Sequence, residues 1–249
     1  MKLTDKVAIV TGGASGFGKA ICELYATEGA KVVVADINGQ GAREVAKGIG
    51  KQAHHLAVDV ANKKEVDAMI AEAVRTFGGL DIMVNNAGYT HKNQPMLNVT
   101  EEEFDRIFEV NVKAIYLAAL ACVPEMEKRG GGVIINTAST AGLRPRPGLT
   151  WYNGSKGAAV TLTKSMAGEL GSKNIRVCAI CPVIGETGML ELFMGMPDTP
   201  ENRAKFLATI PLGRFSKPDD VANAALFLAS PESSMITGVA LEVDGGRCV

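Results

Sequence analysis

A tyrosine and a lysine four residues apart occur in the stretch TWYNGSKGAAV, residues 150–160. A helix through this stretch would place the side chains of Tyr152 and Lys156 on one face, a single turn apart. The pair has two interpretations. Either a partly buried tyrosine lies beside a solvated lysine, or the phenol transfers a proton while the ammonium tunes its pKa. The pair alone does not choose between them.

Two further polar residues stand where chemistry could use them. Ser139 follows the β-branched run VIINTA, residues 133–138, and a strand there would end at the edge of the sheet where α/β proteins bind ligands. Asn111 lies inside the helical stretch FEVNVKAIYLAAL, although asparagine is a poor residue for a helix interior. Taken singly, the serine could be a cap and the asparagine a polar filler.

A glycine-rich turn lies near the N-terminus, in VAIVTGGASGFGKAI, residues 7–21. Its spacing, Gly12-x-x-x-Gly16-x-Gly18, falls between a predicted strand and a predicted helix. Such glycines let the backbone approach a pyrophosphate, which the free N–H groups and dipole of the helix N-terminus then stabilise. The alternative is a simple tight turn.

An aspartate ends the next predicted strand, KVVVAD, residues 31–36. Asp36 follows Gly18 at nearly the spacing at which an acidic residue meets the adenosine ribose. Its carboxylate would accept hydrogen bonds from the ribose hydroxyls and repel a 2′-phosphate. No Arg or Lys offsets that repulsion at Ser15, Phe17, Ile37 or Asn38. The sequence therefore predicts NAD(H) in preference to NADP(H).

Short β-branched runs alternate with segments of helical periodicity along the whole chain. This pattern predicts an α/β fold: a single doubly wound domain over 1–249, with a seven-stranded parallel sheet covered by helices on both faces. The predicted strands are 7–11, 31–36, 53–58, 81–85, 133–138, 175–180 and 239–243. The predicted helices are 16–28, 39–48, 63–77, 102–128, 152–171 and 218–229.

One long segment, about 186–215, breaks this alternation with Met, Leu and Phe residues punctuated by prolines. It is either an extra helix pair packed on the edge of the sheet or a lid over a ligand, and its length favours the lid.

The Cys178-x-x-Cys181 pair falls on a predicted strand. Residues three apart on a strand point to opposite faces, so we expect packing rather than redox or metal chemistry.

The bulk composition excludes several classes of protein. The chain has 249 residues, 47% of them hydrophobic and 21% charged, and a net charge of −1 with no basic cluster. We therefore expect no nucleic-acid or membrane partner. The apolar stretch at 7–10 is too short for a signal peptide, so a cytoplasmic protein is expected. The histidines His54, His55 and His91 form no metal-binding pattern, and surface positions are expected for them.

The motifs together resemble the short-chain dehydrogenase/reductase family. TGGASGFG (11–18), NNAG (85–88), Asn111, Ser139 and Tyr152-x-x-x-Lys156 occur in the order and spacing of that family, and the likeness continues to ITGVALEVDGG (236–246). The resemblance implies hydride transfer between a nicotinamide ring and a carbonyl or alcohol carbon. It also implies a homotetramer built from the helices near 102–128 and 152–171 and the C-terminal strand.

The resemblance assigns a role to each catalytic candidate. Tyr152 becomes the acid or base, and Ser139 the donor to the substrate oxygen. Lys156 becomes the cation that lowers the phenol pKa and binds the nicotinamide ribose, and Asn111 the holder of a water that links the lysine to solvent. A free phenol has a pKa of about 10, too high for a base at neutral pH, so the tuning is needed.

The implied cofactor site is larger. Asn85, Ala87 and Gly88 match the loop along the adenine and ribose, and Asp59 matches the residue that bonds the adenine amino group. As an alternative, Asp59 could cap the helix that starts near Asn62. The expected cofactor-binding residues are Gly12, Ser15, Gly16, Phe17, Gly18, Asp36, Ile37, Asp59, Val60, Asn86, Ala87, Gly88, Tyr152, Lys156, Pro182, Val183, Ile184 and Thr187.

One position departs from the family pattern. Val183 stands after Pro182 where a glycine is usual, and its β-branched side chain narrows the allowed backbone and fills space beside the carboxamide. Ile184 through its backbone and Thr187 through its hydroxyl are expected contacts, although Thr187 could instead be a helix N-cap.

Apolar residues dominate the expected substrate pocket, which suggests a small hydrophobic or mixed ketone or secondary alcohol. The substrate-facing candidates are Tyr89, Leu143, Trp151, Met189, Leu190 and Phe193, with Arg144, Arg146, His91 and Glu186 as polar candidates.

We expect an NAD-dependent oxidoreductase of a small secondary alcohol, polyol or ketone. Two alternatives remain open. The chain also resembles 3-oxoacyl-[acyl-carrier-protein] reductases, including in IPLGRFSKPDD (210–220), but Asp36 and the sparse basic residues argue against that role. A nucleotide-binding sensor without turnover is the third interpretation, which the complete catalytic set disfavours.

Overall fold

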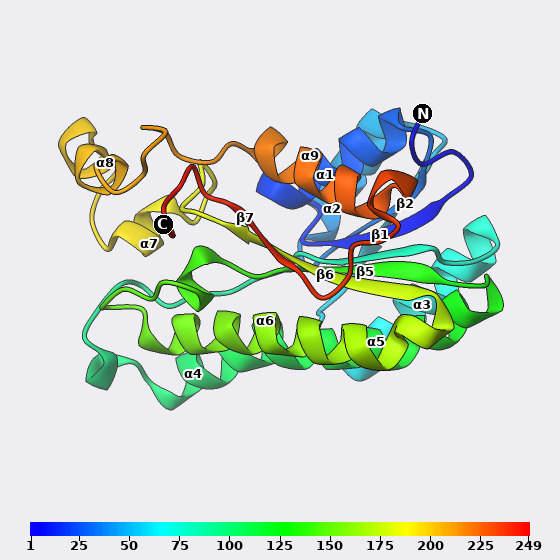
Figure 1. Ribbon diagram of the computed structural model, residues 1–249, viewed down its shortest axis with the longest axis horizontal. Helices are drawn as coiled ribbons and strands as arrows, with labels where there is room; N and C mark the ends of the chain where they lie inside the picture. The colour runs from blue at the N-terminus through cyan, green and yellow to red at the C-terminus, as the bar shows by residue number, and fades with distance from the viewer.

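A seven-stranded parallel sheet runs through the centre of the protein, in a computed structural model that describes residues 1–249 (Figure 1). The strand order is β3-β2-β1-β4-β5-β6-β7. The strands are β1 (Val7–Thr11), β2 (Lys31–Asp36), β3 (Ala53–Ala57), β4 (Ile82–Asn85), β5 (Gly132–Thr137), β6 (Ile175–Pro182) and β7 (Ala240–Val243). The predicted fold class is confirmed, and the predicted strand ends agree within one or two residues.

Helices cover both faces of this sheet. Figure 1 shows α1, α2 and α9 on one side and α3, α5 and α6 on the other. Apolar residues alternate between the two cores along each central strand, because neighbouring side chains of a strand point to opposite faces. The helices are α1 (Gly16–Thr27), α2 (Gly39–Ile49), α3 (Lys63–Phe77), α4 (Glu101–Phe108), α5 (Ala114–Lys128), α6 (Thr150–Leu170), α7 (Leu190–Met194), α8 (Pro200–Leu207) and α9 (Pro218–Ala229).

The two cysteines of the C-x-x-C pattern lie on opposite faces of β6, as expected. Cys178 packs in the core under α1 and α9, whereas Cys181 packs in the core under α6. Both side chains are fully buried, and burial raises the pKa of each thiol. They therefore act as small hydrophobic residues of the strand.

The predicted helix 102–128 is continuous but not uniform. Between α4 and α5 it widens into a π-helical turn, Glu109–Lys113, which carries Asn111. Such widened turns often coincide with functional sites. By length and composition the whole stretch Glu101–Lys128 could cross a membrane, a test that core helices of soluble proteins also pass. Here α5 packs against α3 and the sheet.

The strand order creates a binding crevice at one edge. β1 lies between β2 and β4. Strands β2 and β3 are added on one side of β1 and strands β4 to β7 on the other, so the strand order reverses at β1. The connections that follow the two strands therefore separate, and ligands bind in the gap between them. The glycine-rich turn follows β1, and the NNAG sequence begins in β4. The helices α7 and α8 lie at one end of the molecule, near the C-terminus (Figure 1).

Candidate active site

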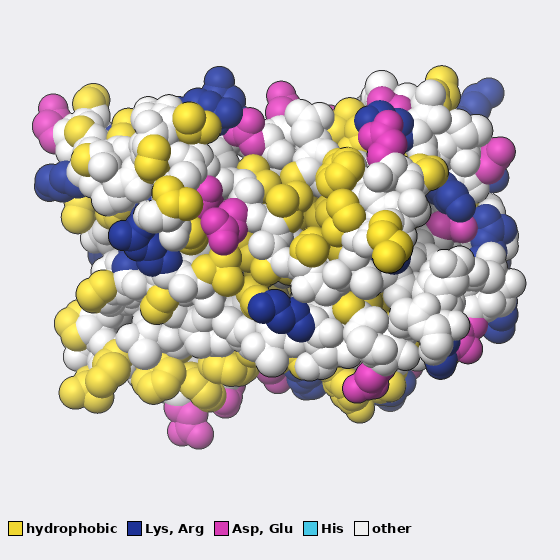
Figure 2. All heavy atoms as spheres, in the orientation of Figure 1, with side chains coloured by type: hydrophobic (Ala, Val, Ile, Leu, Met, Phe, Trp, Pro, Cys, Tyr) yellow, Lys and Arg dark blue, Asp and Glu magenta, His cyan; other side chains and the backbone are white.

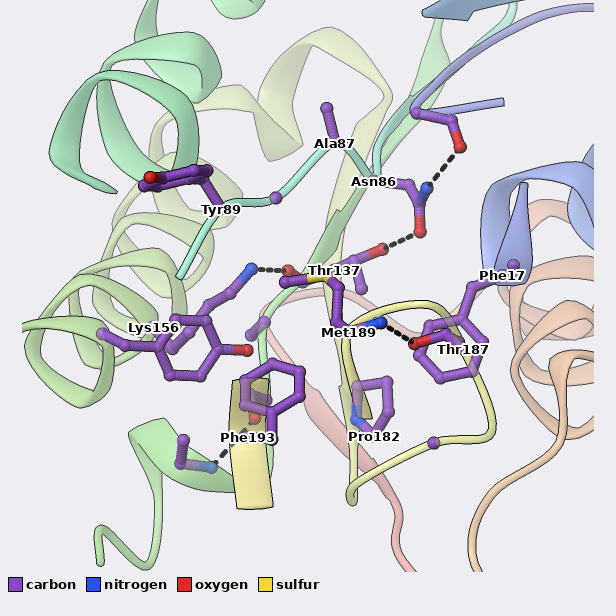
Figure 3. Close-up of a pocket in the computed structure, with 18 of the residues that line it drawn as sticks. Phe17, Asn86, Ala87, Tyr89, Thr137, Lys156, Pro182, Thr187, Met189 and Phe193 are labelled. Carbon is purple, nitrogen blue, oxygen red and sulfur yellow. Dashed lines mark hydrogen bonds between the residues drawn. The ribbon is translucent and has the colours of Figure 1, made fainter. Parts of the chain in front are cut away.

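A cavity of about 520 Å³ opens over the carboxyl ends of the strands. It extends from the turn after β1 to the helices α7 and α8, and Figure 3 shows part of its lining. Most of the sequence candidates line it together: Gly12, Ser15, Gly16, Phe17, Asp36, Ile37, Asp59, Val60, Asn86, Ala87, Gly88, Tyr89, Ser139, Tyr152, Lys156, Pro182, Val183, Ile184, Thr187, Met189 and Phe193.

The glycine-rich turn forms one wall of the cavity. Gly12 and Gly16 adopt φ of +65° and +51°, a conformation that side chains disfavour. Gly18 lies beneath the turn rather than in the lining, where an added Cβ would be 2.0 Å from the carbonyl oxygen of Gly12. The Asn86 amide donates to the Thr11 and Gly12 carbonyls, which ties the turn to the end of β4 (Figure 3).

The first turn of α1 has backbone donors to spare. Ser15 is its N-cap residue, but the serine side chain makes no capping hydrogen bond. The N–H groups at the start of a helix have no partner within the helix. A phosphate lying on this turn would receive those N–H groups together with the positive end of the helix dipole.

Asp36 ends β2 at the margin of the cavity. Its carboxylate accepts hydrogen bonds from the backbone N–H groups of Ala14, at 3.0 Å, and Asn38, at 2.9 Å. These two bonds hold the carboxylate beside the glycine-rich turn. The side chain has no basic partner, so its negative charge is not neutralised by the protein.

Asp59 follows β3 and has an arginine partner. Arg106, from α4, donates to both carboxylate oxygens, at 3.1 and 3.4 Å. Burial raises the pKa of Asp59, but the Ala61 backbone N–H and Arg106 together outweigh it and hold the pKa below its usual value. The alternative role as cap of α3 is wrong, because Asn62 caps that helix by accepting from the Lys64 backbone N–H.

Asn111 lies behind the cavity rather than in its lining. Its Oδ1 accepts from the Tyr89 N–H at 2.9 Å, and its Nδ2 donates to the Tyr89 carbonyl at 2.8 Å and to Ser155 Oγ at 3.0 Å. The π-helical turn thus brings one amide into contact with both the loop after β4 and the helix α6. The contacts define a positioning role for Asn111; water binding stays a prediction.

Tyr152 is 5% exposed and faces the cavity from α6. Its ring packs edge-on against Phe193 of α7, with ring centres 5.2 Å apart. Burial raises the pKa of Tyr152 to about 12, and the Ser139 hydrogen bond and the charge of Arg146 offset only part of that effect. The sequence predicts a lowered phenol pKa; among the groups of the protein, desolvation outweighs the positive charge of Arg146.

Lys156 lies one helical turn after Tyr152 and is also buried. Its Nζ donates to the Thr137 carbonyl at 2.7 Å (Figure 3). The same atom lies 5.8 Å from the centre of the Tyr152 ring. Burial lowers the pKa of Lys156 to about 8. An ammonium held in the cavity wall with one protein acceptor retains donors for a bound polar ligand.

Three predicted substrate residues do not reach the cavity. Trp151 is turned away from Tyr152 because adjacent helix residues point about 100° apart, and its Nε1 donates to the Met96 carbonyl at 3.2 Å. Leu190 is buried in a small core beneath α7. Leu143 is 37% exposed and lies outside the lining. These three side chains therefore lie outside the lining of the cavity.

Some of the polar substrate candidates line the cavity and others do not. Arg144 and Arg146 line the cavity, whereas Glu186 pairs with Arg203 at 3.3 Å and lies outside it. His91 is buried at 2% exposure, so the predicted surface position is wrong for this histidine. Its Nδ1 lies 2.7 Å from the Lys92 carbonyl.

Sequence reasoning missed several lining residues, among them Arg106, Leu149, Phe206, Thr209 and Arg247. None of them belongs to a motif. They come from α4, the segment before α6, the α8 region and the C-terminus, so only the folded chain brings them together. A charge-pairing search between Asp59 and α4 could have suggested Arg106.

These groups suit a dinucleotide with a nicotinamide ring. The positive-φ glycines leave space that a Cβ would fill, the start of α1 offers free donors, and Asp36 supplies an acceptor at the far margin. At the other end, Ser139, Tyr152 and Lys156 provide a donor, an acid and a cation. Ser139, Tyr152 and Lys156 are the groups that protonation of a carbonyl oxygen needs.

Comparisons with known proteins agree with this chemistry. A family model described as enoyl-(acyl carrier protein) reductase matches residues 12–247. The 4-formylbenzenesulfonate dehydrogenase of Comamonas testosteroni is 52% identical over 99% of both chains. The 3-oxoacyl-[acyl-carrier-protein] reductase of Thermotoga maritima is 38% identical over the full length of both.

Two solved structures resemble this fold. The 3-ketoacyl-(acyl-carrier-protein) reductase of Brucella melitensis, complexed with NADH, has a TM-score of 0.94 and 48% identity over 99% of this chain and 100% of that one. A 7α-hydroxysteroid dehydrogenase complexed with NADH and 7-oxo glycochenodeoxycholic acid has a TM-score of 0.92 and 40% identity, covering 98% and 95%.

The doubly wound fold and the site define an oxidoreductase that acts on CH–OH groups. The chain belongs to the short-chain dehydrogenase/reductase family. The resemblance inferred from the sequence motifs is thereby confirmed.

Proposed function

We propose that the protein transfers a hydride between NAD(H) and the CH–OH or C=O carbon of a small secondary alcohol, polyol or ketone. The observation that carries this proposal is the convergence of Ser139, Tyr152 and Lys156 in one cavity with Asp36 at its far margin. The nicotinamide ring would supply or accept the hydride. Every other requirement of the reaction falls to side chains of this chain.

Tyr152 would move the proton. In the reductive direction its hydroxyl donates a proton to the oxygen of the substrate, and in the oxidative direction its phenolate accepts one. Ser139 donates a hydrogen bond to the same oxygen as negative charge develops on it. Lys156 stabilises the phenolate from one helical turn away and offers its remaining N–H groups to the ribose hydroxyls.

The segment 186–215 would close the substrate end of the cavity. Thr187, Met189 and Phe193 line it before and along α7, and Phe206 and Thr209 line it from α8 onward. We therefore favour the lid interpretation of this segment. Closure over the reacting carbon would exclude water from it.

Asp36 supports NAD(H) as the cofactor. An unpaired carboxylate that accepts from two backbone N–H groups would repel a 2′-phosphate, and no basic side chain flanks it. We expect kcat/KM for NADH to exceed that for NADPH by at least roughly tenfold. Asp36→Ala should reduce that ratio, while Asp67→Ala, an exposed change on α3, should leave it unaltered. A preference of the wild-type protein for NADPH would contradict the proposal.

The runner-up function is that of a 3-oxoacyl-[acyl-carrier-protein] reductase, which the names of two relatives favour. A substrate panel separates the two. Diols, sugars, simple ketones and aryl aldehydes test the first proposal; the aldehydes are included because one relative is a 4-formylbenzenesulfonate dehydrogenase. A 3-oxoacyl thioester tests the second. NADH binding without turnover of any compound would favour the non-catalytic sensor.

A further inference from the structure

The charged residues of the cavity are segregated. Its only acidic lining residues, Asp36 and Asp59, lie beyond β2 and β3, where the adenosine half of a dinucleotide would bind. The opposite end is lined by three arginines, Arg144, Arg146 and Arg247, and by no aspartate or glutamate side chain. Basic side chains are visible beside the C-terminus in Figure 2.

Arg146 is the arginine of this end whose charge acts on Tyr152. Its Nη2 donates to the Phe193 carbonyl at 2.9 Å, and its guanidinium carbon lies 5.0 Å from the centre of the Phe206 ring. The Phe193 ring in turn packs on Tyr152. The positive charge of Arg146 acts to lower the pKa of that tyrosine, so the guanidinium and the phenol share one end of the cavity.

Arg146 has no anionic partner in the protein. Burial lowers its pKa, the Tyr152 phenol raises it, and the neighbouring charge of Arg247 lowers it further; no carboxylate contributes. The fully buried side-chain atoms that lack a hydrogen-bond partner belong to His91 and Asn153. The guanidinium nitrogens of Arg146 that make no hydrogen bond are therefore not fully buried, and Arg146 lines the cavity. Partial burial of a cation costs desolvation free energy, and an anion that pairs with its free N–H donors would offset that cost.

The other two arginines differ from it. Arg144 is exposed and donates to the backbone oxygens of Arg247 and Val249, at 2.6 and 2.9 Å. These bonds fold the C-terminal tail over the cavity and leave Arg247 in its lining. Arg247 lies close enough for its charge to lower the pKa of Arg146, and no Asp or Glu side chain is among the groups that shift that pKa.

We propose that Arg146, flanked by Arg247, binds a carboxylate or sulfonate group of the substrate. The substrate is then an anionic carbonyl compound or alcohol whose apolar body packs between Leu149, Met189, Phe193 and Phe206, with its reacting carbon at Tyr152. A guanidinium pairs with both anions through two parallel hydrogen bonds. This inference rests on the proposed hydride transfer and specifies its substrate class.

Matched ketones test the charge directly. The probes are 4-acetylbenzoate against 4-acetylbenzamide, and 4-acetylbenzenesulfonate against its sulfonamide, which differ in charge at similar size. Isothermal titration of the NAD⁺-loaded protein measures binding without turnover, since a ketone and NAD⁺ do not react. We expect each anion to bind roughly 10- to 100-fold more tightly than its neutral partner. The pair with the larger ratio identifies carboxylate or sulfonate as the preferred group.

Variants assign that preference to Arg146. In Arg146→Met the ratio should fall to about one, mainly through a higher KM for the anion in the NADH assay, and Arg146→Lys should restore part of it. Arg146→Gln repeats the test should the methionine variant fail to fold. Arg75→Met, which removes an exposed arginine of α3, should behave as wild type.

Two outcomes would overturn the inference: equal binding of anion and neutral ketone by the wild-type protein, or a preference that survives in Arg146→Met. Failure of the proposed function looks different. Selective binding of the anions without reduction by NADH would contradict hydride transfer to these ketones and leave the anion site standing. Reduction of the anionic and neutral ketones with equal efficiency would support hydride transfer and contradict the anion site.

Discussion

The protein buries both the tyrosine that would transfer the proton and the lysine that would stabilise its phenolate. Tyr152 and Lys156 are 5% and 4% exposed, and burial moves their pKa values in opposite directions, to about 12 and about 8. Desolvation favours the neutral form of each group, so the protein's own groups favour a neutral phenol. Such a phenol is a competent proton donor, and base function in the oxidative direction needs added positive charge.

Removing the phenolic hydroxyl isolates this role. Tyr152→Phe should lower kcat by roughly 10²- to 10⁴-fold, because the proton donor is lost while the ring and its contact with Phe193 remain. NADH binding, followed by fluorescence titration, should change little. Tyr116→Phe, an exposed tyrosine of α5, is the matched control and should keep full activity. Substantial turnover by Tyr152→Phe would remove this residue from the mechanism.

The buried lysine predicts a pH dependence of stability. In the unfolded chain Lys156 keeps its proton up to its ordinary pKa of 10.5, whereas in the folded protein it loses the proton near pH 8. Between these values the unfolded state binds more protons, so the folded state gains stability as pH rises. Wild type should gain about 2 kcal/mol relative to Lys156→Met between pH 8 and 10. Urea unfolding at each pH measures this; parallel curves would contradict it.

The elements show which parts of the protein were predictable. The central strands and the positions of the catalytic candidates followed from the sequence, because the interiors of the central strands are apolar and Ser139 and the glycine-rich turn directly follow strand ends. Side-chain direction at the ends of elements did not follow. Trp151 and Leu190 sit one helical position from cavity residues, and that single step turns them onto Phe104 and into a core. The unpaired state of Arg146 likewise depends on which residues of α7, α8 and the C-terminus fold over it.

The contact between α1 and the glycine-rich turn gives a test at this scale. In Gly18→Ala the new Cβ would clash with the Gly12 carbonyl and the Asn86 amide, so either the turn or the helix must shift. We expect a loss of about 1–3 kcal/mol in unfolding free energy and weaker NADH binding. Gly168→Ala, in the exposed interior of α6, meets nothing within 4 Å and should stabilise by about 0.5–1 kcal/mol. Equal effects of the two changes would show that the close approach is unimportant.

At the scale of the whole molecule, two surfaces lack a covering. β7 is an edge strand, and Figure 2 shows hydrophobic side chains gathered over it and α9. The most apolar window of Glu101–Lys128 is only 44% buried, and Tyr116 and Leu120, one helical turn apart on α5, are 59% and 49% exposed. Monomeric proteins rarely leave such areas open. We therefore propose a homotetramer, in which one surface joins two subunits into a dimer and the other surface joins two such dimers.

Light scattering of a variant with one added carboxylate on α5 tests this assembly. Wild type should have the mass of four chains of 26.1 kDa, and Leu120→Glu should lower it to that of a dimer, because a carboxylate on the α5 face would lose its hydration in the subunit contact. The β7 edge is unchanged in this variant and should keep the subunits paired. Leu97→Glu, at an 86% exposed position outside both surfaces, should leave the tetramer intact. A monomeric wild-type protein would refute the proposal, and a Leu120→Glu tetramer would exclude α5 from the contact.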